Sequence, residues 1–180
     1  MSRFVFLDRD GTLVRDTGYP HRPEDYELLP GTPEALERLR SAGYGLAIVT
    51  NQSGIGRGLF SESDFRSFQD LLLRDLAAHG VEIAATYHCP HAPGDGCGCR
   101  KPAPGLLLRA RDELGAELER CWLVGDAERD VAVAARAGCG GAIRVGAAAG
   151  TPAPGERPAV FHEAADLAEA AERILAEGAW

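Results

Sequence analysis

Two aspartates near the start of the chain are spaced to share a metal ion. Asp8 and Asp10 follow the apolar run at residues 4–7 and precede Gly11 and Thr12. A short apolar run predicts a buried strand, and the end of such a strand lies at the sheet edge where open α/β folds bind ligands. Carboxylates this close repel each other unless a cation lies between them. The spacing favours a metal-assisted site; an acidic turn is the alternative, because Asp and Gly are common in turns.

Polar residues also follow two other apolar runs. Thr50 and Asn51 end one run, and Asp126 ends another, with Asp130 four residues further on. The carboxyl ends of parallel strands share one edge of a sheet, so we expect these side chains to meet the two N-terminal aspartates. Lys101, which lies between the strands in the sequence, is the cation that stands out beside them.

This set of side chains is suited to phosphoryl transfer. One carboxylate can attack phosphorus and form an acyl phosphate, and a second can protonate the leaving oxygen and later deprotonate water. Carboxylates, a backbone carbonyl, water and the phosphate supply the oxygen ligands that Mg²⁺ prefers. A hydroxyl, an amide and a lysine can hold the equatorial oxygens of the transferred group.

A second group of residues has the composition of a zinc site. Cys89, His91, Cys97 and Cys99 provide three thiolates and one imidazole within one short stretch. That is a full tetrahedral set with no position open for water, so we expect structural Zn²⁺. The alternatives are a Cys89–Cys97 disulfide, free thiols, or His88 in place of His91.

The predicted zinc loop, residues 89–99, directly precedes Arg100 and Lys101. A metal in this loop would therefore fix both cations at the mouth of the site. The remaining cysteines, Cys121 and Cys139, are expected to be small core or loop residues.

Composition narrows the function classes. A chain of 180 residues fits one domain with a sizeable core, and a net charge of −8 argues against broad nucleic-acid binding. There is no run of eighteen apolar residues for a membrane span. The first residues lack the apolar stretch of a signal peptide, so we expect a cytoplasmic protein, which we further expect to be monomeric.

Apolar runs alternate with helical patterns along the chain, which predicts an α/β fold with a doubly wound parallel sheet. Residues 14–30 are expected to form a loop across the mouth of the site, and residues 147–158 a low-complexity connector. The glycine-rich residues 53–58 could cradle phosphate or form a flexible loop. Strands are expected at 4–7, 46–49, 83–88, 121–124 and 142–145, and helices from Thr32 to Gly43, from Ser61 to Gly80, and at about 104–114, 129–137 and 163–176.

The motifs together resemble the haloacid dehalogenase (HAD) superfamily of phosphotransferases. Asp-x-Asp-Gly-Thr at 8–12, Thr50, Lys101 and Gly-Asp-x-x-x-Asp at 125–130 occur in the order typical of that superfamily, each after the expected element. The resemblance implies a Rossmann-like, HAD-like fold. We expect it to lack a large cap domain.

Further motifs narrow the resemblance to the D-glycero-D-manno-heptose 1,7-bisphosphate 7-phosphatases. They are Phe-Leu-Asp-Arg-Asp-Gly-Thr at 6–12, Gly-Tyr at 18–19, Thr-Asn-Gln-Ser-Gly-Ile-Gly-Arg-Gly at 50–58, Cys-Pro-His at 89–91 and Cys-Gly-Cys-Arg-Lys-Pro at 97–102. The similarity extends to about residue 146. Histidinol-phosphate phosphatases share most of these motifs.

The resemblance implies a Mg²⁺-dependent phosphatase that acts through an aspartyl-phosphate intermediate. The implied reaction removes the 7-phosphate of heptose 1,7-bisphosphate and feeds the synthesis of nucleotide-activated heptose for lipopolysaccharide or other surface polysaccharides. The alternatives are a phosphatase of histidinol phosphate or another small ester, and a non-catalytic binding protein stabilised by zinc.

The resemblance also implies roles for individual residues. Asp8 would be the nucleophile and a Mg²⁺ ligand. Asp10 would be the general acid and base, with its backbone carbonyl on the Mg²⁺ that Asp126 helps to bind. Thr50 and Lys101 would hold the transferred phosphoryl group.

Substrate contacts are implied in the same way, with one departure. Heptose phosphatases often have a lysine directly after the aspartate of the last motif, and this chain has Ala127. Arg129 or Arg57 could replace that cation. The implied substrate-binding residues are Arg9, Asp16, Thr17, Gly18, Tyr19, Asn51, Gln52, Ser53, Arg57 and Arg100.

Overall fold

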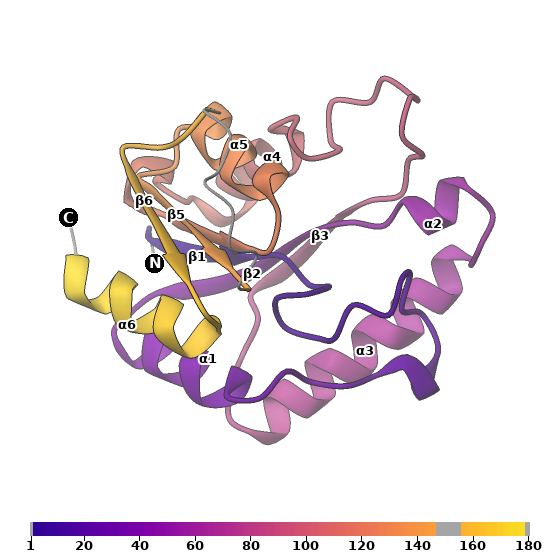
Figure 1. Ribbon diagram of the computed structural model, residues 1–180, viewed down its shortest axis with the longest axis horizontal. Coiled ribbons are helices and arrows are strands. Elements are labelled where there is room, and N and C mark those ends of the chain that lie inside the picture. The colour runs from indigo at the N-terminus through magenta and orange to yellow at the C-terminus, as the bar shows by residue number, and fades with distance from the viewer. Residues whose placement is uncertain (1, 147–155, 179–180) are drawn as a thin grey trace.

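The computed structural model describes residues 2–146 and 156–178, and its centre is one parallel β-sheet (Figure 1). The sheet has six strands in the order β3-β2-β1-β4-β5-β6, and each neighbouring pair is parallel. The predicted doubly wound parallel sheet is thus confirmed. The strands are β1 (Phe4–Leu7), β2 (Gly45–Asn51), β3 (Ala85–Cys89), β4 (Trp122–Gly125), β5 (Gly141–Val145) and β6 (Val160–Ala164).

Helices cover both faces of the sheet (Figure 1). On one face lie α1 (Thr32–Ser41), α3 (Glu62–Ala78) and α6 (Leu167–Glu177), and on the other lie α4 (Gly105–Leu114) and α5 (Glu128–Ala137). A short helix, α2 (Ser53–Gly56), follows β2, and two 3₁₀ turns lie at Pro23–Asp25 and Leu118–Arg120. No helix among the described residues is both long and apolar enough to cross a membrane.

The two helical layers explain why the central strands are continuously apolar. All four residues of β1 are buried, because one face packs against α1, α3 and α6 and the other against α4 and α5. Each face thus has its own hydrophobic core cluster: Trp122 belongs to the cluster under α1, α3 and α6, and Phe6 to the cluster under α4 and α5. Both clusters support the strand ends that carry the predicted site residues.

Helix starts follow local signals in the sequence. Ser61 caps α3 as predicted: its hydroxyl accepts from the backbone N–H of Asp64 at 3.1 Å, and the Asp64 carboxylate accepts from the N–H of Ser61 at 2.7 Å. The start of α1 differs by one residue from the prediction, because Gly31 is the N-cap and Thr32 is the first helical residue. Gly31 has φ +76°, a conformation that favours glycine.

The C-terminal region differs from the prediction. Val160–Ala164 is a sixth strand paired with β5, whereas the sequence pattern led us to expect a helix from about residue 163. The helix begins at Leu167, because the Asp166 carboxylate caps it by accepting from the N–H of Glu169 at 2.9 Å. Most of the predicted connector at 147–158, namely residues 147–155, lies outside the described residues.

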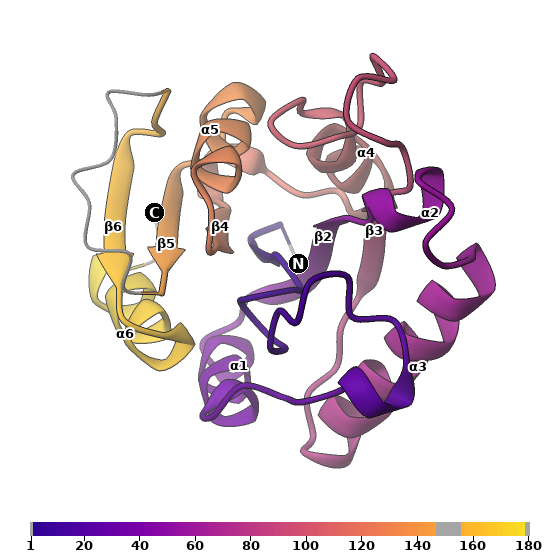
Figure 2. The same ribbon diagram turned by 45° about the vertical axis from the view of Figure 1, so that its right-hand side comes forward.

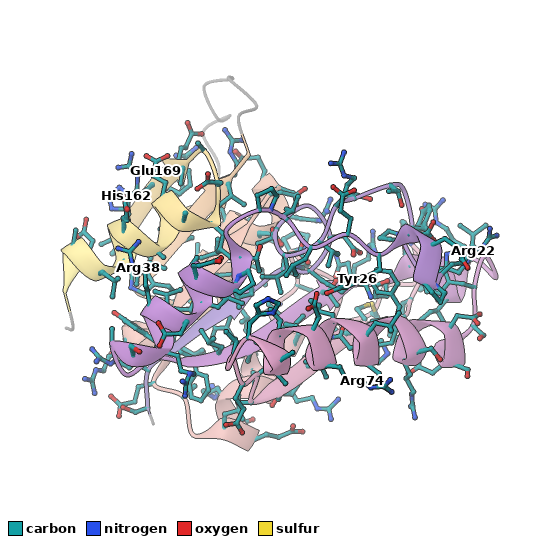
Figure 3. All side chains as sticks on the ribbon, turned by 90° about the horizontal axis from the view of Figure 1, so that it is seen from below. Arg22, Tyr26, Arg38, Arg74, His162 and Glu169 are labelled. Atoms are coloured by element: carbon teal, nitrogen blue, oxygen red, sulfur yellow. The ribbon has the colours of Figure 1, made fainter. Side chains whose placement is uncertain are left out.

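The segment between β1 and α1 runs out from the sheet towards α3 (Figure 2). Short bridges link Val14 to Asp10 and Leu28, and the Tyr26 hydroxyl donates to the Asp75 carboxylate of α3 at 2.6 Å (Figure 3). The predicted loop is therefore fixed along the helix. Among the described residues, the elements between the strands are single helices and connecting loops, and no cap domain is inserted.

Candidate active site

Strand ends bring three carboxylates together at one edge of the sheet. Asp8 follows β1, Asp126 follows β4, and Asp130 lies in the first turn of α5. One ligand oxygen from each lies within 4.8 Å of the others. The predicted meeting of the ends of the first and fourth strands is therefore present.

This cluster offers the oxygen donors that a divalent cation such as Mg²⁺ needs. Oδ1 of Asp126 is buried and has no hydrogen-bond partner among the described residues. Burial, followed by the nearby carboxylates of Asp8 and Asp130, raises the pKa of Asp126 to about 6. A Cβ at Gly11 would lie 2.3 Å from Oδ2 of Asp126, so only glycine leaves room there. The donor set fits a bound cation, which would offset the repulsion among the three carboxylates.

Lys101 supplies the positive charge within the cluster. Its side chain is 1% exposed, and Nζ lies 2.6 Å from Asp130 and 3.0 Å from Asp8. Nζ also donates to the carbonyl of Val49 at 2.8 Å. Burial disfavours the charged lysine, but the carboxylates of Asp130 and Asp8 outweigh it and raise the pKa of Lys101. The sequence placed Asp130 near the site through the Gly-Asp-x-x-x-Asp spacing but gave it no role, and its pairing with Lys101 was not predicted.

Asn51 positions Lys101 through the backbone. Its side-chain carbonyl accepts from the N–H of Lys101 at 3.0 Å, and its amide donates to the carbonyl of Lys101 at 3.1 Å. Asn51 was predicted to contact substrate, and it does line the site cavity. Its polar atoms nevertheless also hold the chain that carries the lysine.

Asp10 lies outside the three-carboxylate cluster and pairs with Arg9. The guanidinium contacts both carboxylate oxygens, at 2.7 and 3.1 Å, and the amide of Gln52 donates to the second at 2.9 Å. Burial raises the pKa of Asp10 despite the opposing charge of Arg9. Arg9 was predicted to contact substrate; its side chain has no exposed surface and does not line the cavity described below.

A cavity of about 270 Å³ opens beside these groups. It brings together most of the predicted catalytic and substrate residues from three segments of the chain. Thr17 and Arg57 are exposed and do not line it. The buried Lys101 does not line it either, but its Nζ lies 3.0 Å from Asp8, which does. Its lining residues are Asp8, Asp10, Asp16, Gly18, Tyr19, Thr50, Asn51, Gln52, Ser53, Arg100 and Arg129.

Tyr19 forms part of the rim in an unusual conformation. It has φ +63°, which is uncommon for a residue with a side chain, and the residue is 38% exposed. The Arg57 guanidinium carbon lies 5.9 Å from the ring centroid. Arg57 thus contacts the rim rather than the cavity.

The four predicted zinc ligands form a second compact cluster. The Sγ atom of Cys99 lies 3.2 Å from both Cys89 Sγ and His91 Nδ1, and the Sγ atoms of Cys89 and Cys97 are 3.7 Å apart. A disulfide would need about 2.05 Å, and all these cysteines are free. Four such donors at these separations suit tetrahedral Zn²⁺.

His88 does not join this cluster. Its Nε2 contacts the carboxylate of Glu62 at 3.1 Å, and its ring lies 4.2 Å from that of Phe65. The cluster that the structure forms contains His91 instead. The alternative with His88 as a ligand is therefore wrong.

The predicted zinc loop is attached to the elements around the cavity. The N–H of Gly56 in α2 donates to the carbonyl of Pro90 at 2.8 Å, and the N–H of Gly105 in α4 donates to that of Gly98 at 2.9 Å. A Cβ at Gly105 would lie 2.3 Å from the Gly98 oxygen. This close packing fixes the loop that leads into Arg100 (Figure 1).

Comparison with known proteins shows the family. The model for haloacid dehalogenase-like hydrolases matches residues 21–138. This chain belongs to that family. D-glycero-beta-D-manno-heptose-1,7-bisphosphate 7-phosphatases from Photorhabdus laumondii and Escherichia coli are each 38% identical to it; the alignments cover 94% of this chain and 95% and 93% of those relatives.

Solved structures agree with this assignment. A D,D-heptose 1,7-bisphosphate phosphatase from B. bronchiseptica, complexed with magnesium and phosphate, superposes with a TM-score of 0.88 at 37% identity and covers 99% of this chain and 100% of that one. The HAD-like fold is thereby confirmed. The protein is a phosphatase, that is, a phosphoric monoester hydrolase.

Proposed function

We propose that this HAD phosphatase removes the 7-phosphate of D-glycero-D-manno-heptose 1,7-bisphosphate and leaves the 1-phosphate. The observation that carries the proposal is the cluster of Asp8, Asp126 and Lys101 beside a cavity that also contains two arginines. The names of relatives that match almost the whole chain support the choice of substrate. We further propose that the protein acts as a cytoplasmic monomer.

Asp8 is the proposed nucleophile. Its Oδ1 accepts from the N–H of Arg9 at 2.8 Å and contacts Lys101, so Oδ2 is the oxygen that attacks phosphorus. As the new bond forms, the bond between phosphorus and the sugar oxygen breaks, and Asp10 donates its proton to that oxygen. Water then attacks the aspartyl phosphate, Asp10 accepts its proton, and inorganic phosphate leaves.

Two further groups stabilise the charge of the transferred phosphoryl group in this proposal. Thr50 lines the cavity, and Nζ of Lys101 lies 3.0 Å from the cavity-lining Asp8. The carboxylates of Asp8 and Asp126 and the backbone carbonyl of Asp10 would hold Mg²⁺, which supplies positive charge next to the phosphoryl oxygens when it is bound.

We assign the second phosphate of the substrate to Arg100 and Arg129. Both line the cavity, and Arg100 has a buried Nη1 without a hydrogen-bond partner among the described residues. Arg129 lies two residues beyond Ala127, the position at which the resemblance led us to expect a lysine. A guanidinium from the first turn of α5 would then replace that lysine in binding phosphate.

We also propose that Cys89, His91, Cys97 and Cys99 bind a structural Zn²⁺. Their mutual distances and the absence of an open position support this assignment. The metal would hold the loop that precedes Arg100, and so would act on substrate recognition rather than on the chemical step.

A panel of phosphate esters tests the proposed substrate. We expect kcat/KM to be highest for heptose 1,7-bisphosphate, measured with both anomers, and much lower for histidinol phosphate and simple monoesters. A preference for histidinol phosphate would contradict the heptose assignment. Absence of phosphate release from every ester would instead favour a non-catalytic binding protein.

A further inference from the structure

Arg9 is a buried charge that the proposed chemistry leaves without a role. Its side chain has no exposed surface. Two aromatic rings of α3 lie against it, with the guanidinium carbon 4.6 Å from the ring centroid of Phe68 and 5.4 Å from that of Phe65. A charge buried this deeply is costly unless its partners compensate for the lost water. The partners of Arg9 therefore indicate what it does.

The first partner is the carboxylate of Asp10, which Arg9 holds at two points. Nε lies 2.7 Å from Oδ1 and Nη2 lies 3.1 Å from Oδ2. A planar guanidinium fixes both the position and the plane of a carboxylate in this arrangement, and a lysine could not do so.

Gln52, which also lines the cavity, extends the pairing. Its carbonyl oxygen accepts from Nη2 of Arg9 at 3.2 Å, while its amide donates to Oδ2 of Asp10 at 2.9 Å and to Oγ1 of Thr50 at 3.0 Å. Both oxygens of Asp10 are thus held, and the same network contacts the hydroxyl of Thr50, a cavity-lining residue of β2.

The third partner of Arg9 is the loop over the cavity. Nη2 donates to the carbonyl of Pro20 at 3.0 Å, directly after Tyr19 on the cavity rim. We propose that Arg9 is a positioning residue. It orients Asp10 for proton transfer and holds the rim segment at Pro20 in place relative to Asp10. This inference rests on the acid–base role proposed for Asp10.

A double-mutant cycle tests the inference. Arg9→Lys keeps the charge but loses the two-point contact, so we expect kcat to fall at least about tenfold while KM changes less than about threefold. Asp10→Asn should slow turnover by at least about 10²-fold. If Arg9 acts through Asp10, adding Arg9→Lys to Asp10→Asn lowers kcat by less than about twofold more.

The outcomes separate this inference from the proposed function. An equal loss of kcat from Arg9→Lys in both backgrounds would overturn the positioning role and leave Asp10 as the acid and base. Normal turnover of Asp10→Asn would overturn that acid–base role, and the inference with it. Arg74→Gln, an exposed arginine on α3, is the matched control and should keep wild-type kcat and KM.

A second variant covers the case in which Arg9→Lys does not fold. Gln52→Met removes the amide contacts to Asp10 and Arg9 from the cavity side and keeps a similar volume. It should also lower kcat, and it should add little to Asp10→Asn. If Gln52→Met lowered kcat by the same factor in the wild type and in Asp10→Asn, that result would contradict the network, as the same result for Arg9→Lys would.

Discussion

Lys101 illustrates how single residues define this site. Burying an ammonium group costs several kcal/mol unless charged partners surround it, and Asp8 and Asp130 both lie within 3.0 Å. The motif spacing predicted that Lys101 and Asp8 belong to one site. It did not predict that Asp130 pairs with the lysine or that Arg9 points inward, because spacing along the chain fixes the element of a side chain but not its partners.

Arg129 provides the residue-scale test of the second phosphate site. Arg129→Gln removes a charged hydrogen bond to the non-reacting phosphate, so KM for the bisphosphate should rise about tenfold with little change in kcat. Hydrolysis of p-nitrophenyl phosphate, which has no second phosphate, should stay the same. Steady-state kinetics on both substrates measures this. An equal loss on both esters would contradict the assignment, and Arg74→Gln on the outer side of α3 (Figure 3) is the control.

The loop at residues 89–99 matters at the scale of elements. It connects β3 to α4, contacts α2 and α4 through backbone hydrogen bonds, and ends next to Arg100 and Lys101. The sequence predicted this loop because its ligand types are specific. It did not predict β6, since Val160–Ala164 is short and the alanine-rich residues beyond it resemble a continuous helix.

Removing one proposed zinc ligand should destabilise the whole loop at residues 89–99. Cys97→Ser should lose the bound metal and lower the melting temperature, because structural zinc contributes on the order of 10 kcal/mol in small sites. Metal analysis should find about one zinc per chain in the wild type and none in the variant. Pro93→Ala, an exposed position in the same loop without a donor atom, should keep both properties. Full zinc content in Cys97→Ser would contradict a four-ligand site.

The whole molecule is arranged so that one sheet edge collects the chemistry. Parallel strands direct the ends of β1, β2 and β4 to that edge, and helices on both faces bury the strands. This architecture was predictable because continuous apolar runs alternate with amphipathic segments. The shape of the cavity was not, since it depends on how residues 14–30 pack along α3 through contacts such as Tyr26 with Asp75.

The most direct test of the central claim follows the phosphorus atoms of heptose 1,7-bisphosphate by ³¹P NMR. With Mg²⁺ present, the 7-phosphate signal should disappear as inorganic phosphate appears, and the 1-phosphate signal should remain. Chelation of Mg²⁺ or the substitution Asp8→Ala should stop this change. Loss of the 1-phosphate, or continued turnover by Asp8→Ala, would contradict the account.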